Sequence, residues 1–266
     1  MVRDARAHPG VLQPYLWGMA HVTSSFPMSP VDVLAFGAHP DDVELSAGGT
    51  LAKLAHQGKR CAIVDLTRGE LGTRGSAALR DEEASDAGQI LGLVHRENLG
   101  LSDGFFEENE ENLLRVISAI RRLRPAVILA NALSDRHPDH GRAASLVARA
   151  AFLSGLAKIH TGTAHDPEDP WRPRAVYHYI QDYDRTPDVV MDITGFVDVK
   201  MAAIHAYKSQ FHDPHSEQPE TPISSPEFLD HVKGRATSMG RPVGFKAGEG
   251  FESSRPLGVA SLLDLC

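Results

Sequence analysis

The chain has 266 residues, of which 27 are Lys or Arg and 35 are Asp or Glu, so its formal net charge at pH 7 is −8. Since a field of this sign repels phosphate groups and no Lys/Arg-rich run opposes it, we expect no nucleic-acid partner. No stretch approaches the roughly 18–20 consecutive apolar residues that a bilayer-spanning helix needs, so we expect no membrane partner either.

Residues 1–28 differ from the rest of the chain. They contain no charged segment followed by a continuous apolar run, so they do not resemble a secretory signal. We expect 1–28 to be a disordered N-terminal extension and 29–266 to form one domain. The two cysteines, Cys61 and Cys266, make no disulfide framework, and a reducing cytoplasm is the predicted location.

Short apolar runs alternate with helix-like segments along the domain. This alternation predicts an α/β, Rossmann-like domain whose mostly parallel sheet is covered by helices on both faces. Strands are expected at 31–37, 61–66, 126–130, 175–180 and 189–193. Helices are expected at 44–57, 77–92, 112–123, 140–156, 197–207 and 225–239.

Two polar clusters follow strands of this predicted sheet. The first, 39–44 (HPDDVE), comes directly after 31–37, and the second, 135–140 (DRHPDH), comes soon after 126–130. Ligands bind open parallel sheets beyond the carboxyl ends of the strands, so both clusters are placed to form one site.

These clusters hold the residue types of a catalytic metal site. A catalytic zinc has three protein ligands and one position open to water, and His39, Asp42 and His140 would provide the three. Asp41 is then free to act as general base on the water, and His137 to stabilise the oxyanion or protonate the leaving amine. A His₂Asp donor set accepts Zn²⁺ or Fe²⁺. In the alternative interpretation Asp42 caps a helix and the two later histidines are solvated loop residues.

Together, 39–44 and 137–140 (HPDH) resemble the paired signature of the PIG-L/LmbE deacetylase superfamily. The resemblance runs from residue 31 to the end of the chain. Shorter matches resemble the bacillithiol-biosynthesis branch and lie at 36–38 (FGA), 65–67 (DLT), 206–211 (AYKSQF), 249–251 (EGF) and 255–257 (RPL).

This resemblance implies a Rossmann-like hydrolase with one zinc. Its expected substrate is a small-molecule sugar conjugate, N-acetylglucosaminyl L-malate, from which it would remove the acetyl group. It implies a homo-oligomer, since relatives are often hexamers. Position by position, it implies His39, Asp42 and His140 as zinc ligands, Asp41 as base and His137 as the electrostatic or acid partner.

Four further residues are candidates near the site. The resemblance implies that Arg80 holds substrate, where its planar fork would suit sugar hydroxyls or a carboxylate; the alternative is an ordinary surface helix residue. Arg136 would reach a substrate carboxylate or merely neutralise its acidic neighbours. Tyr207 would donate to the oxyanion or pack in the core. Asp139 is expected to orient His137 or another histidine of the cluster.

Other substrates suit the same chemistry, and other classes of protein share the predicted fold. Within the superfamily the rivals are an inositol conjugate, a chitobiose-type sugar and a thiol-conjugate amide. A nucleotide-binding Rossmann-like module would need a glycine-rich turn after the first strand, where this chain has 39–42 (HPDD). A sugar-binding relative without activity is a third alternative, although every motif position is intact. Loss of activity on zinc removal would separate the enzyme from both.

Overall fold

The computed structural model describes residues 29–163 and 165–265, so the extension predicted at 1–28 lies outside the described residues. The strands are β1 Val33–Gly37, β2 Cys61–Thr67, β3 His95–Leu101, β4 Val127–Ala130, β5 Ala175–Tyr179, β6 Val189–Asp192 and β7 Gly248–Ser253. The helices are α1 Asp42–His56, α2 Ala77–Ile90, α3 Glu110–Leu123, α4 Pro138–Leu153, α5 Val197–His205 and α6 Pro226–Gly240, with short 3₁₀ helices η1 Arg241–Val243 and η2 Leu262–Leu265.

One seven-stranded sheet, of order β3-β2-β1-β4-β5-β7-β6, forms the centre of the molecule. The strands from β3 to β5 are parallel, whereas β7 runs antiparallel to both of its neighbours. The prediction of a single α/β, Rossmann-like domain with a mostly parallel sheet is therefore confirmed. All the predicted helices and strands are present, but β3 and β7 were not predicted.

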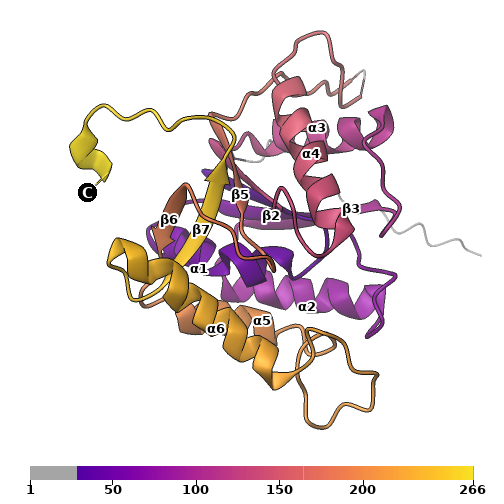
Figure 1. Cartoon of the computed structure of the whole chain (residues 1–266). Helices are drawn as coiled ribbons and strands as arrows, with labels where there is room; N and C mark the ends of the chain where they lie inside the picture. Colours follow the sequence, from indigo (N-terminus) through magenta and orange to yellow (C-terminus); the bar gives the residue numbers. More distant parts are fainter. Residues whose placement is uncertain (1–28, 164, 266) are drawn as a thin grey trace, which may run out of the picture.

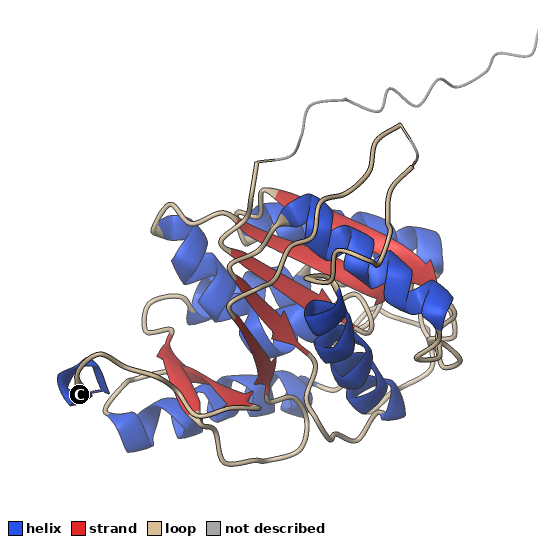
Figure 2. Ribbon diagram, turned by 90° about the horizontal axis from the view of Figure 1, so that it is seen from above, coloured by secondary structure: helices blue, strands red, loops and turns tan. Residues whose placement is uncertain are grey.

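Helices cover both faces of the sheet (Figures 1 and 2). On one face α3 and α4 pack over Leu34 and Phe36, and on the other α1, α2 and α5 pack over Val33 and Ala35. Side chains of a strand alternate between the two faces, so β1 is apolar on both. Within the described ranges, no helix is both long enough and apolar enough to cross a bilayer.

The last strand fixes the middle of α1, the helix that follows the first polar cluster. The Glu249 carboxylate on β7 accepts hydrogen bonds from the backbone N–H groups of Gly49 at 3.0 Å and Thr50 at 2.7 Å. The buried Lys200 of α5 donates to the same carboxylate at 2.6 Å, which neutralises its charge. A Cβ at Gly49 would lie 2.7 Å from Ile193, so only glycine permits this close packing.

Arg121 of α3 stabilises the segment that follows α4 by hydrogen bonds to its backbone. Its buried guanidinium donates to the backbone oxygens of Ser154 at 3.0 Å, Leu156 at 2.9 Å and Ile159 at 2.8 Å. Arg121→Met leaves these oxygens unpaired and is expected to lower the free energy of unfolding by roughly 2–4 kcal/mol, measured by urea denaturation. Arg115→Met, at an exposed position of the same helix, should lower it by less than about 1 kcal/mol. Equal losses in the two variants would contradict this role.

Candidate active site and metal centre

The two polar clusters meet at the carboxyl ends of β1 and β4, where they line a cavity of about 380 Å³. His39, Asp41, Asp42, His137 and His140 all line this cavity, so the structure brings together the five residues that the sequence proposed for metal binding and catalysis. Four of them are buried, and His137 is half-buried.

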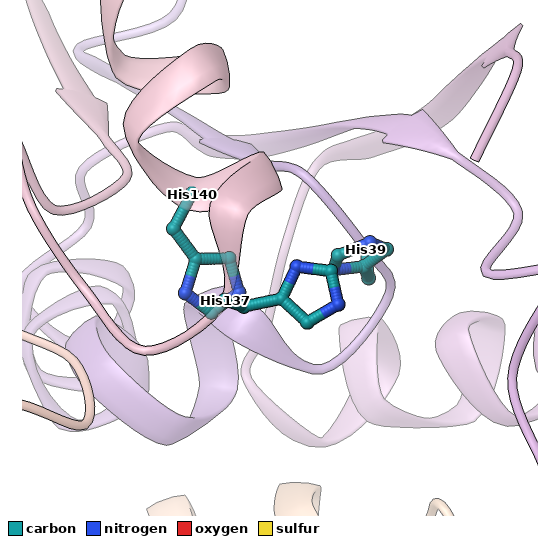
Figure 3. Close-up of side chains that lie close together, drawn as sticks. All are labelled: His39, His137 and His140. Carbon is teal, nitrogen blue, oxygen red and sulfur yellow. The ribbon is translucent and has the colours of Figure 1, made fainter. Parts of the chain in front are cut away.

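Three imidazole rings lie side by side in the cavity (Figure 3). His39 comes from the turn between β1 and α1, whereas His137 is the N-cap residue of α4 and His140 lies in its first turn. The ring centroids are 4.7 Å apart for His39 and His137, 5.2 Å for His137 and His140, and 5.8 Å for His39 and His140. One nitrogen from each ring lies within 4.8 Å of the others, a spacing that could hold a metal ion.

The carboxylate of Asp42 lies between two of these rings. Its oxygens are 3.6 Å from Nδ1 of His39 and 3.0 Å from Nε2 of His140. The other nitrogen of each ring faces a second carboxylate, since Nε2 of His39 is 3.0 Å from Asp103 and Nδ1 of His140 is 2.5 Å from Asp135. Histidines that bind metals usually have such a partner on the far nitrogen, which fixes the tautomer and the ring orientation.

His137 is held differently. Its Nδ1 accepts a hydrogen bond from the backbone N–H of Asp139 at 3.3 Å, and no carboxylate oxygen of the described residues lies within 4.0 Å of its ring nitrogens. Burial lowers the pKa of His137, and the neighbouring His39 and His140 lower it further. The carboxylate of Asp139 instead lies 3.4 Å from Nε2 of His39, so it faces another histidine of the site.

The surroundings of Asp42 favour its ionised form. It accepts hydrogen bonds from Asn131 at 3.0 Å, from Gln181 at 3.1 Å and from the backbone N–H of His39 at 2.9 Å. Burial raises the pKa of Asp42, but His140 and His39 outweigh burial and hold that pKa well below its ordinary value. Three hydrogen bonds and two imidazoles around one carboxyl group favour its charged form.

Asp41 occupies a strained turn. Its φ of 109° lies in the region that favours glycine, and strain of this kind persists only where the surroundings enforce it. Arg80 holds the turn, because its Nη2 donates to the backbone oxygen of Pro40 at 2.7 Å and to Oδ2 of Asp41 at 3.0 Å. Burial raises the pKa of Asp41 to about 7, although Arg80 opposes the rise. Arg80 lines the cavity, as the substrate-binding prediction requires, but its contacts are with the turn.

Arg136 and Tyr207, two further candidates for substrate binding, lie in different places in the structure. Arg136 lines the cavity at its exposed edge, where its Nε lies 2.5 Å from Asp182. Tyr207 does not line the cavity: its ring is fully buried, and its hydroxyl donates to Glu44 at 2.9 Å. Of the two roles expected for Tyr207, its burial and its hydrogen bond to Glu44 of α1 fit packing in the core.

Sequence reasoning missed several residues of the site, among them Asp103, Asp135 and Gln181. Asp103 follows the unpredicted β3, Asp135 begins the second cluster, and Gln181 follows β5. A search for polar side chains at the end of every strand would have found Gln181, and would have found Asp103 once β3 was known.

The chain is similar to proteins of one family. The family model described as GlcNAc-PI de-N-acetylase (PIG-L) matches residues 34–152. The diacetylchitobiose deacetylase of Thermococcus kodakarensis is 30% identical over 189 residues, which cover 67% of this chain and 70% of that protein. The 4-oxalmesaconate hydratase of Pseudomonas putida is 27% identical over 204 residues, covering 67% and 74%.

A solved structure agrees over most of the molecule. The conserved protein TT1542 of Thermus thermophilus superposes with a TM-score of 0.77 at 35% identity, covering 87% of this chain and 98% of that one. The family match runs from β1 almost to the end of α4, and so contains both polar clusters. The chain therefore belongs to the PIG-L family of de-N-acetylases, hydrolases that act on amide bonds.

Proposed function

We propose that the protein is a metal-dependent deacetylase that hydrolyses the N-acetyl group of a glucosaminyl conjugate. The observation that carries this proposal is the convergence, in one cavity, of the donor atoms of His39, Asp42 and His140 beside the separate carboxylate of Asp41. Membership of the PIG-L family supports the same reaction.

The donor set fits a divalent metal of the zinc or iron type. The nitrogens of His39 and His140 that face Asp42 have carboxylates behind them, which leaves His137 as the third ring without such a partner. We therefore assign His39, Asp42 and His140 as ligands and keep His137 for another role. When bound, such a metal would polarise the acetyl carbonyl and lower the pKa of a water molecule.

The other side chains have separate tasks. Asp41 accepts a proton from the attacking water, and Arg80 keeps its carboxylate in place. His137, whose Nδ1 accepts from the backbone of Asp139, donates from its other ring nitrogen to the oxyanion. The proton that Asp41 took from water passes to the amine nitrogen as the carbon–nitrogen bond breaks. The products are acetate and a free glucosamine amine, so one water is consumed for each amide hydrolysed.

The substrate that we propose is N-acetylglucosaminyl L-malate. Support comes from the segments 206–211, 249–251 and 255–257, which resemble the bacillithiol branch. The rivals are a chitobiose-type sugar, as in the name of the Thermococcus relative, and an inositol or thiol conjugate. A second reaction is hydration, because the Pseudomonas relative is named a hydratase. A hydratase adds water to its substrate and releases neither acetate nor amine.

Release of free amine from synthetic N-acetylglucosaminyl L-malate tests the proposal. Zinc-loaded enzyme is expected to turn the substrate over at least about 100-fold faster than chelator-treated enzyme, because the metal would contribute several kcal/mol to the transition state. Added zinc should restore the rate, and plain N-acetylglucosamine is the control substrate. Amine release that is unaffected by chelation would contradict the metal, and no release from any N-acetyl sugar would contradict the deacetylase.

We also propose a cytoplasmic location and a homo-oligomer, a hexamer by resemblance. The location is supported by the free thiol of Cys61, which is buried in β2. The hexamer is supported by the resemblance alone, and light scattering of the purified protein tests it.

A further inference from the structure

Three arginines line the cavity, and two of them already hold carboxylates. Arg80 is 3.0 Å from Asp41, and Arg136 is 2.5 Å from Asp182. A guanidinium that is engaged in this way has little charge left for a ligand, because its partner carboxylate cancels most of its field. The third arginine, Arg235, is the exception.

Arg235 extends from α6 to the wall of the cavity formed by α1. Its Nη2 donates to the backbone oxygen of Leu45 at 3.0 Å, and no carboxylate oxygen of the described residues lies within 4.0 Å of its guanidinium. Since an arginine has five N–H donors, this one hydrogen bond leaves most of the fork available to a ligand.

The acidic groups that act on Arg235 from a greater distance are mostly engaged elsewhere. They are Asp182, Glu249, Asp135 and Asp184. Asp182 is held by Arg136, Glu249 by Lys200 and Asp135 by His140. Burial lowers the pKa of Arg235, and these four carboxylates only partly oppose it. Arg235 is half-buried, and a guanidinium partly withdrawn from water without a contacting anion is less stable than one in solution. A bound anion would offset that loss.

The wall beside Arg235 also offers a hydroxyl and apolar surface. Ser46, which follows Leu45 in α1, lines the same cavity, is 4% exposed, and its Oγ has no hydrogen-bond partner. Ile223, on the segment that leads into α6, and Phe228, in the first turn of α6, also line the cavity. Apolar neighbours lower the local dielectric constant, so a charged hydrogen bond at this wall is stronger than one in water.

We propose that Arg235 binds a carboxylate on the aglycone of the substrate and thereby selects acidic conjugates over neutral ones. Its planar fork fits the two oxygens of a carboxylate, and Ser46 would donate to the same group. A sugar hydroxyl could not neutralise the guanidinium. This inference rests on the proposed deacetylase function, and it favours the malate conjugate over chitobiose-type and inositol conjugates that carry no charge.

Two substrates of nearly equal shape test the inference: N-acetylglucosaminyl L-malate and its dimethyl ester, which lacks the charges. The wild-type enzyme is expected to prefer the acid in kcat/KM. Arg235→Gln should lower this preference by about 10- to 100-fold, the range of a hydrogen-bonded charge pair. Arg235→Lys, which keeps the charge without the fork, should lower it less. Lys233→Gln, which removes one positive charge from an exposed position of the same helix, should leave the preference unchanged.

The outcomes separate the inference from the function on which it rests. If the wild-type enzyme deacetylates acid and ester equally well, or if Arg235→Gln lowers both rates by the same factor, the inference is wrong and the deacetylase stands. If neither compound releases amine while another N-acetyl sugar does, the acidic aglycone is wrong. If no N-acetyl sugar reacts, the proposed function fails and the inference fails with it.

Discussion

Replacing Asp41 by asparagine is expected to lower kcat by about 10²- to 10⁴-fold, the usual contribution of a general base. The substitution keeps the size of the side chain and its hydrogen bond to Arg80, but the amide cannot accept a proton from water. Because Asp41 is not an assigned ligand, the metal content of the purified protein should stay the same. The measurements are kcat for amine release and the metal content by mass spectrometry.

Asp86→Asn is the matched control for this variant. Asp86 is an exposed acid on α2, so its loss should change neither kcat nor the metal content. A kcat for Asp41→Asn within about 3-fold of the wild type would exclude general-base catalysis by this residue. Loss of the metal would instead make Asp41 a ligand and require a different assignment of the site.

Gly69→Ala is expected to lower kcat/KM by about 100-fold, although it removes no functional side chain. Arg80 donates to the backbone oxygen of Gly69 at 3.3 Å and passes directly over it. A Cβ at Gly69 would lie 1.9 Å from Nη1 and 2.6 Å from Cζ of Arg80, so the guanidinium must move away. Without it, the strained turn at Asp41 loses its clamp and the carboxylate leaves its position.

A control for backbone strain exists in the same chain. Gly69 and Gly100 both have φ of 62°, but a Cβ at Gly100 would meet nothing within 4 Å. Gly100→Ala therefore carries the strain without the clash, and should retain most of the wild-type kcat/KM.

In an Arg80→Ala background, Gly69→Ala should add little further loss of kcat/KM, since the guanidinium that it displaces is absent. Additive losses in the double variant would refute the mechanism.

The sequence was sufficient to predict the strands that are buried on both faces. In β1, β2 and β4 nearly every residue is apolar because helices cover both sides of the sheet. Strand β3 (HRENLGL) lies at the sheet edge, where its half-exposed polar residues hide the pattern. In β7 (GEGFES) the buried Glu249 is acceptable only because Lys200 and α1 supply its partners, and these come from distant parts of the chain.

The sequence predicted the site residues that lie within its two motifs, but not those whose positions depend on distant parts of the chain. Residues within a motif, such as His39 and His140, could be placed because each cluster lies shortly after a strand. Asp103 could not, because its position depends on β3 and on a contact with a histidine 64 residues away. The environment of Tyr207 was equally hidden, since Glu44, which accepts its hydrogen bond, lies 163 residues earlier.

The place of β7 in the sheet has a consequence for how the protein is made. Strand β6 pairs with β7, which in turn pairs with β5, so β6 joins the sheet through the strand that is synthesised last. Glu249 arrives on that strand as well, and until then the N–H groups of Gly49 and Thr50 lack this carboxylate as an acceptor. A ribosome-bound or truncated chain that stops before residue 248 therefore leaves the helix that carries Asp42 without its anchor. The anchor of α1 is therefore complete only in chains that include β7.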